Sequence, residues 1–311
     1  MRPNDYDVSG SVRTTDPAAV GDEVIRLFRA LFERPAVRPL TRAFRHAARL
    51  YEGRHPDYWP CDTEYHDIQH VLDVTLAMAR LMDGYERSRA NGAEPLTAEL
   101  FTVGVAAALF HDIGYLRRRN DHKHRYGAEY TLVHVSRGSM FLGRYLREIG
   151  LDEHLARLGA TLVHFTGYER PAESIRLAGT LERRLGQMLG TADIIAQMSD
   201  RCYLEKCRDR LYPEFVLGRL GGFASAKDLV LKTPRFYEGA CQRLDEKLGR
   251  SYDYAARHFG GPNLYLDTMR RNAEYAQSVA QSSEISQRLR RHPPKTLLPD
   301  VEPYPKDLVG L

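Results

Sequence analysis

The sequence has few of the features that mark several large classes of protein. It contains 4 cysteines among 311 residues, and no two of them are spaced as C-x-x-C. A disulfide framework or a thiolate zinc site is therefore not expected. No apolar run reaches the length of about eighteen residues that a membrane-spanning helix needs. The first twenty residues lack the apolar core of a signal peptide, so we expect a cytoplasmic protein without a membrane partner.

Motifs of several nucleotide-binding and hydrolytic folds are also missing. The chain has no P-loop, no dinucleotide-binding glycine motif, no nucleophile elbow and no internal repeat. Almost no segment alternates between apolar and polar residues with period two, so strands are not expected. The net charge of +4 is too small to predict a broad basic face, and we expect no nucleic-acid partner. The fold class predicted is all-α.

Helical periodicity divides the chain into four parts. Residues 1–15 read as a flexible N-terminal arm, and Asp16-Pro17 then opens the first helix as an N-cap followed by proline. A helical domain spans 16–215, and a C-terminal helical extension spans 216–291. The tail 292–311 is rich in proline, so we expect it to be extended and to lie on the body or on the second subunit of a homodimer. Expected helices cover about 16–32, 40–51, 64–82, 97–110, 128–149, 152–165, 181–211, 222–250 and 263–291.

One expected helix carries the main functional signal. Thr97 is suited to be its N-cap, and residues 100–110 are nearly all apolar or small, without a polar face. A helix of this kind is normally buried on every side. It ends in His111 and Asp112, and burying a carboxylate beside an imidazole is costly unless something compensates them. A metal ion would compensate both, so further ligands are expected elsewhere in the chain.

Two other segments supply them. His66 and His70 are four residues apart in the expected helix 64–82, so both imidazoles would point the same way. Asp193 lies among small and apolar residues, which is unusual for a solvated aspartate. Metal ligands from His70, His111, Asp112 and Asp193 suit Mn²⁺, Mg²⁺, Zn²⁺, Fe²⁺, Ni²⁺ or Co²⁺. Two ions are an open alternative to one, with Asp112 as the bridge and His124 or His164 supporting the second.

The predicted chemistry is the cleavage of a phosphoester by a metal-activated hydroxide. His66, one turn before His70, is placed to protonate the leaving oxygen as general acid. A strongly basic connector follows the HD pair directly. Its cations Arg117, Arg118 and Lys123 are the expected contacts for a substrate phosphate, since arginine binds phosphate bidentately and lysine as a point charge.

Three of these segments together resemble a known family. The order H…HD…D is similar to that of the HD superfamily of metal-dependent phosphohydrolases. The stretch Y-H-D-I-Q-H-V-L-D-V resembles the Y-H-N-x-x-H-x-x-D-V signature of class I cyclic nucleotide phosphodiesterases. The stretches A-L-F-H-D-I-G and T-A-D-I-I resemble that family's next two metal-ligand segments. The resemblance spans roughly residues 60 to 210.

The resemblance implies an HD-domain helical bundle with extra N- and C-terminal helices. It makes His66 the proton donor to the leaving 3′-oxygen and His70, His111, Asp112 and Asp193 the metal ligands. The chain departs from the family at Asp67, where the signature has asparagine. The family's glutamine and aromatic clamp for the purine have no clear counterpart in the sequence.

The leading functional hypothesis is therefore a phosphohydrolase acting on a small-molecule phosphoester or nucleotide, above all a nucleotide-type phosphodiester. One alternative is a nucleotide mono- or triphosphohydrolase of the same superfamily. Another is a non-catalytic module that senses a metal or a nucleotide, which would not need the proton donor His66.

Overall fold

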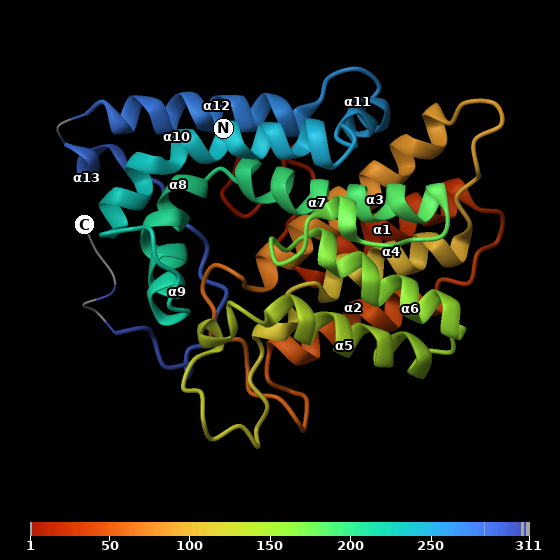
Figure 1. Cartoon of the computed structure of the whole chain (residues 1–311), viewed down its shortest axis with the longest axis horizontal. Helices are drawn as coiled ribbons and strands as arrows, with labels where there is room; N and C mark the ends of the chain where they lie inside the picture. The colour runs from red at the N-terminus through yellow and green to blue at the C-terminus, as the bar shows by residue number, and fades with distance from the viewer. Residues whose placement is uncertain (1, 283, 306–307, 309–311) are drawn as a thin grey trace.

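The computed structural model describes residues 2–282, 284–305 and 308. Within this part of the chain the protein is all-helical, which confirms the predicted fold class (Figure 1). No strand occurs among the described residues, where pairing is confined to two isolated bridges, Tyr6 with Arg13 and Tyr58 with Arg118. In the same part, no helix is both long and apolar enough to cross a bilayer.

The α-helices are α1 (Pro17–Leu31), α2 (Arg38–Tyr51), α3 (Ile68–Ser88), α4 (Ala98–Phe110), α5 (His134–Glu148), α6 (Glu153–Leu162), α7 (Thr180–Ser199), α8 (Tyr203–Lys206), α9 (Tyr212–Leu217), α10 (Ala226–Gln242), α11 (Asp253–Phe259), α12 (Leu264–Ala280) and α13 (Ile285–Arg288). Short 3-10 turns include η1 (Ile113–Tyr115), η2 (Gly127–Tyr130), η3 (Val163–Phe165) and η4 (Ala172–Ser174). The segments η5 (Cys207–Leu211) and η6 (Arg243–Lys247) are π-helical.

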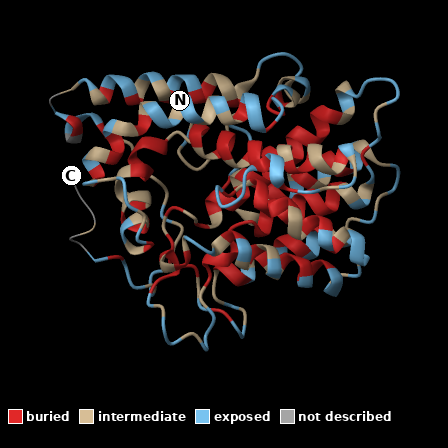
Figure 2. Ribbon diagram, in the orientation of Figure 1, coloured by how far each residue is buried: buried red, intermediate tan, exposed pale blue. Residues whose placement is uncertain are grey.

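The apolar helix α4 forms the centre of the core. It packs against α2, α3, α5 and α6, and all of its residues from 101 to 110 are buried. Figure 2 shows the buried positions concentrated in this part of the bundle. Thr97 caps the helix, with its side chain accepting a hydrogen bond from the Leu100 N–H, as the sequence predicts. The C-terminal tip of α4 is thereby fixed inside the protein, and His111 follows it immediately.

Helix α3 begins later than expected, and this changes the setting of His66. Its N-cap is Asp67, whose carboxylate accepts a hydrogen bond of 2.9 Å from the His70 N–H. The prediction that His66 and His70 share a helix is therefore wrong, because His66 lies in the loop before α3. Asp67 replaces the asparagine of the signature that this stretch resembles, and it acts as the N-cap of α3.

The expected single helix over 181–211 is divided. Helix α7 begins at Thr180, close to the expected start, where the Glu182 carboxylate accepts the backbone N–H groups of Ala178 and Gly179. It ends at Ser199, since the Asp200 carboxylate accepts the Cys202 N–H at 2.7 Å and starts a new turn. The expected helix over 222–250 is observed as α10 followed by η6, and Pro234 lies inside α10.

Both end segments pack on the bundle. The arm expected to be flexible is attached along residues 2–15, where the Asp7 carboxylate pairs with Arg80 at 2.7 Å and accepts the Val12 N–H at 2.8 Å. The tail contains no helix over 292–305 and runs along the body. The Pro294 carbonyl accepts a bond from Arg210 and the Thr296 hydroxyl donates to Asp67.

Candidate metal centre

Four predicted ligands meet at the tip of α4. Nε2 of His70 and Nε2 of His111 lie 3.3 Å apart, and each is 3.1 Å from Oδ2 of Asp112. Oδ1 of Asp193, from the middle of α7, lies 3.4 Å from the His70 nitrogen and 3.9 Å from the His111 nitrogen. Ligand atoms of His70, His111 and Asp193 all fall within 4.8 Å of one another. The structure thus brings together residues that are 123 positions apart in the sequence (193 − 70).

The chemistry of these groups fits a divalent cation. His111 Nδ1–H donates to the Ala108 carbonyl at 2.8 Å, which fixes the tautomer and leaves the Nε2 lone pair facing the other ligands. Oδ2 of Asp112 is buried and has no hydrogen-bond partner among the described residues. Although burial favours the neutral acid, His111 and the neighbouring histidines hold the pKa of Asp112 well below its usual range. A buried carboxylate oxygen facing two imidazole nitrogens is a typical cation site.

Asp193 is held in position by two further residues. Nε2 of Gln197 donates to Oδ1 of Asp193 at 3.1 Å, and the Tyr65 hydroxyl donates to Oε1 of Gln197 at 3.0 Å. Gln197 lies one turn after Asp193 on α7, so its amide reaches back along the same helix face. These bonds orient the carboxylate toward the two histidines.

His134 lies on the opposite side of Asp112. Its Nδ1–H donates to the Thr131 carbonyl at 2.6 Å, so Nε2 is the free nitrogen, 3.6 Å from Oδ1 of Asp112. Burial lowers the pKa of His134, which favours the neutral ring that can bind a metal. The two oxygens of Asp112 therefore face different imidazoles. This arrangement suits a carboxylate that bridges two ions.

The two histidines predicted to support a second ion lie elsewhere. His124 is in the basic loop, with Nδ1 2.9 Å from the Asp121 carboxylate. His164 belongs to η3, where burial lowers its pKa and its nearest carboxylate oxygen, on Glu169, is 3.9 Å away. Neither forms an ion pair with Asp112 or Asp193 within the described chain. His134 takes the place beside Asp112, although nothing in its sequence neighbourhood distinguishes it from the other histidines of that interval.

His66 faces the same cleft but is held by a different carboxylate. Its Nδ1–H donates to Oε2 of Glu214 at 2.5 Å, and the other oxygen of Glu214 accepts the Tyr65 N–H at 2.7 Å. Burial alone would lower the pKa of His66, but the carboxylates of Glu214 and Asp112 outweigh it and raise the pKa above its ordinary value. Glu214 is fully buried in α9, far outside the motifs, and the sequence offers no signal for its role.

The ring of Tyr115 lies between His66 and His134. The ring of Tyr115 stacks on His66 with 4.4 Å between centroids and on His134 with 4.3 Å. Tyr115 belongs to η1, the turn that follows Asp112. The stack fixes the ring planes of His66 and His134 relative to the aspartate.

These groups form the polar end of a cavity of about 770 Å³. The opposite wall is apolar and comes mainly from α9, α10 and the loop between them. Phe215 stacks on Phe223 at 5.6 Å, and Phe236 meets Phe223 edge-on at 5.6 Å. Arg235 is the only arginine or lysine that lines the cavity in the described chain. The cavity therefore combines a cluster of metal-ligand type with space for a largely apolar or aromatic group.

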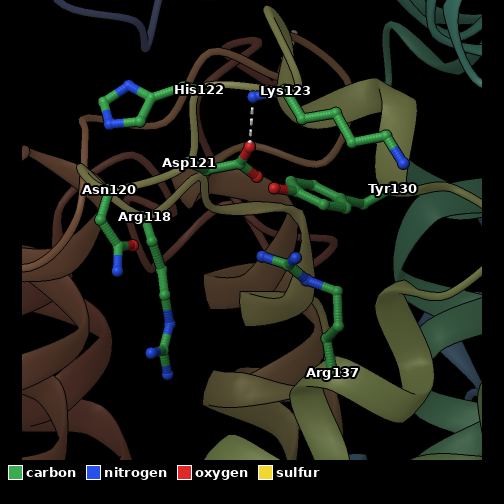
Figure 3. Close-up of a pocket in the computed structure, with 7 residues that line it drawn as sticks. All are labelled: Arg118, Asn120, Asp121, His122, Lys123, Tyr130 and Arg137. Carbon is green, nitrogen blue, oxygen red and sulfur yellow. Dashed lines mark hydrogen bonds between the residues drawn. The ribbon is translucent and has the colours of Figure 1, made fainter.

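The basic loop does not line this cavity. Arg118 and Lys123 border a separate hollow together with Asn120, Asp121, His122, Tyr130 and Arg137 (Figure 3). Arg117 pairs with Asp62 at 2.7 Å. The three cations expected to contact the substrate are thus placed outside the cavity that holds the metal-ligand cluster.

No protein-family model matches this chain, and no curated protein matches its sequence. The geometry of the site is therefore the basis for the assignment that follows.

Proposed function

We propose that this protein is a metal-dependent phosphohydrolase that cleaves a phosphoester, most of all a nucleotide-type phosphodiester. The observation that carries the proposal is that a metal-ligand cluster and a proton donor lie side by side in one cavity. The cluster consists of His70, His111, Asp112 and Asp193. Beside it lies the imidazole of His66, which is hydrogen-bonded to the buried carboxylate of Glu214. A module that only binds a metal or a nucleotide has no use for such a proton donor.

The roles of the residues follow from their contacts. One or two divalent ions, held by the four-residue cluster and by His134, would supply Lewis acidity and activate a water molecule. His66 directs its Nδ1 to Glu214, so Nε2 is the nitrogen left to give a proton to the leaving oxygen. The raised pKa favours the protonated form of His66. Gln197 and Tyr65 keep Asp193 in place.

The apolar wall favours a substrate with one phosphate group over a substrate with several. Phe215, Phe223 and Phe236 offer flat surfaces to a base or another ring. A triphosphate would bring several charges into a cavity with one arginine, Arg235. This argues for the phosphodiester over the triphosphate alternative.

Two substitutions test the proposal. Asp112→Ala should abolish metal binding, because it removes the oxygen that faces both histidines. His66→Ala should retain the metal but slow turnover by about 10²–10⁴-fold. Metal content by elemental analysis and turnover of bis(4-nitrophenyl) phosphate and of cyclic nucleotides measure the two effects.

Two results would count against these assignments. One is a metal-replete parent protein with no activity on any phosphodiester or phosphomonoester. The other is equal loss of metal in both variants.

A further inference from the structure

A second hollow lies behind the wall of the metal-site cavity. It measures about 630 Å³ and is bordered by the basic loop on one side and by Tyr130 and Arg137 on the other (Figure 3). Thr131 and His134, their neighbours in sequence, line the metal-site cavity instead. The two hollows thus share a wall, the segment from η2 into α5, but no lining residue.

The charges of this hollow are unbalanced. Arg118, Lys123 and Arg137 border it, and none of the three forms an ion pair within the part of the chain described. Its one carboxylate, Asp121, already accepts the backbone N–H groups of Lys123 at 2.9 Å and His124 at 3.2 Å. Three cations and one carboxylate leave an excess of two positive charges.

A buried hydroxyl in the same hollow also lacks a partner. Tyr130 is 3% exposed, and its hydroxyl makes no hydrogen bond in the described structure. Its ring is covered by the Arg137 guanidinium at 3.4 Å and lies 4.4 Å from the His124 ring. Figure 3 shows the hydroxyl directed toward the loop that carries Asp121. A buried donor without an acceptor is unfavourable, and an anion in the hollow would supply the acceptor.

The loop is fixed in place by its backbone. The Trp59 N–H donates to the Arg117 carbonyl at 3.0 Å, and the Arg119 N–H donates to the Asp57 carbonyl at 2.9 Å. Other cations of the loop are already engaged: Arg125 pairs with Glu302, and Arg119 lies 4.5 Å over the Trp59 ring. Arg118, whose guanidinium lies 5.7 Å from the Tyr58 ring, and Lys123 are the loop cations that border the hollow, on a backbone that is already ordered.

We propose that this hollow binds the diphosphate or polyphosphate group of a small molecule, at a site distinct from the metal centre. An arginine can donate two parallel hydrogen bonds to the oxygens of one phosphate, and a lysine adds a point charge. The Tyr130 hydroxyl donates to a further oxygen. A pyrophosphate group matches the charge excess better than a single carboxylate or phosphomonoester would. The site does not depend on the hydrolytic function.

Arg137 connects this site to the metal centre. Its Nε donates to the Gly114 carbonyl at 2.8 Å and its Nη2 to the Leu116 carbonyl at 2.9 Å. Both carbonyls belong to the turn that directly follows Asp112. A ligand that draws the Arg137 guanidinium toward the hollow weakens these two hydrogen bonds and so affects the turn after Asp112. The bound diphosphate group would therefore act as a regulator of the metal centre and not as its substrate.

Calorimetric titration of pyrophosphate into the full-length protein tests the binding. It is carried out at low salt on the metal-loaded parent and on Asp112→Ala, which is expected to lose any binding of pyrophosphate at the metal. A saturable site should be present in both. Lys123→Ala and Tyr130→Phe should each weaken it by about tenfold, the second without any change of charge. Arg125→Ala removes one positive charge from a residue of the same loop that does not line the hollow and that already pairs with Glu302, and it should change affinity by less than about twofold.

Two outcomes would overturn the site. Equal weakening by Arg125→Ala and Lys123→Ala, with no effect of Tyr130→Phe, would indicate an adventitious ion only. Loss of all binding in Asp112→Ala would assign pyrophosphate to the metal centre. The regulatory connection has its own measurement, hydrogen exchange of the amides in 113–116. Pyrophosphate should change it in the parent and not in Lys123→Ala, and an unchanged rate in the parent with pyrophosphate bound would refute the connection.

Discussion

At the scale of single residues, the site depends on two carboxylates that hold imidazoles for different purposes. Asp112 faces the Nε2 atoms of His70, His111 and His134, which leaves these nitrogens available for metal binding. Glu214 instead accepts a hydrogen bond from the Nδ1–H of His66. His70, His111 and His134 therefore each present a nitrogen lone pair, whereas His66 presents a proton. This difference distinguishes the proposed metal ligands from the proposed acid more clearly than the sequence motif does.

Glu214→Gln tests the second carboxylate. The amide removes one of the charges that raise the pKa of His66, so fewer molecules carry the proton, and turnover should fall by about 10²-fold. Metal content should stay the same, because Glu214 contacts none of the ligands. In a His66→Ala background the same change should have almost no further effect on turnover.

Glu205→Gln is the matched control for that experiment. Glu205 is also fully buried, but it bonds to Tyr275 and to the backbone of Arg291. It should alter the free energy of unfolding and leave turnover per folded molecule unchanged. Equal losses of turnover in both variants would show that burying any new amide is enough to explain the effect.

The sequence predicts part of this site for a physical reason. An apolar helix with ionisable residues at its tip is readable from one short stretch, and so is an aspartate among small residues on another helix. Glu214 and His134 are not readable in this way, because their roles arise only when α9 and α5 are brought against the tip of α4. The sequence predicts a separate role for His66 but places it in the wrong element, because Asp67 caps α3 and leaves His66 in the loop before the helix.

At the scale of elements, the position of Asp112 depends on how closely η1 approaches α5. A Cβ atom added at Gly114 would lie 1.9 Å from the His134 carbonyl oxygen, and one at Gly138 would lie 2.6 Å from the His111 carbonyl oxygen. Real contacts of this kind do not occur below about 3.0 Å, so the backbones can be this close only without side chains. The spacing of the metal-ligand cluster therefore rests partly on two glycines.

Gly114→Ala should consequently disturb both stability and metal binding. The methyl group must push α5 away from the turn, at a cost of about 1–3 kcal/mol, and His134 would move with the helix. Thermal unfolding and metal affinity measure the two effects. Gly239→Ala is the control, because nothing lies within 4 Å of its Cβ position in α10 and alanine favours a helix by about 1 kcal/mol. A Gly114→Ala protein as stable as the control would contradict the close approach.

The N-terminal segment gives an element-scale prediction that depends on pH. Burial favours the neutral form of Asp7, but Arg80 and three bonds from Ser9 and Val12 outweigh it and lower its pKa below the ordinary value of 3.8. The unfolded chain therefore binds this proton more tightly. The contribution of Asp7 to stability is complete above pH 3.8 and is lost as the pH falls through the lower, folded value.

Asp7→Asn should remove this contribution at neutral pH. It leaves the Arg80 guanidinium, which is 2% exposed, without its carboxylate, at a cost of about 3–5 kcal/mol. Denaturant unfolding between pH 3 and 7 measures the difference, which should shrink toward acid. Asp5→Asn, in an exposed pair with Arg13, should change the free energy of unfolding by less than about 1 kcal/mol. Equal effects of the two variants would mean that the buried Asp7–Arg80 pair contributes no more to the free energy of unfolding than the exposed Asp5–Arg13 pair does.

At the scale of the whole molecule, segments from both ends of the chain attach to the residues around the site. Asp67, which caps α3 in front of His70, receives a bond from Thr296 of the tail. Glu214, which holds His66, receives a bond of 3.4 Å from the buried Tyr304 hydroxyl. Proline content alone predicts that this tail is extended, but not where it lies. Its path follows from polar groups of the body that need partners, so the tail completes the support behind the predicted acid.

Removal of the tail should therefore impair turnover more than folding. A chain ending at Arg291 keeps α12 and α13 but exposes the Glu214 carboxylate to water, which weakens its hold on His66. We expect turnover to fall by about 10–100-fold, as when outer-shell partners of a site are removed. Circular dichroism and metal content should remain close to those of the full chain. Tyr304→Ala should reproduce part of the loss, while Tyr304→Phe should not, because the ring still covers Glu214 and packs on Tyr126 at 5.5 Å between centroids. A truncated protein with full turnover would show that His66 is positioned without the tail.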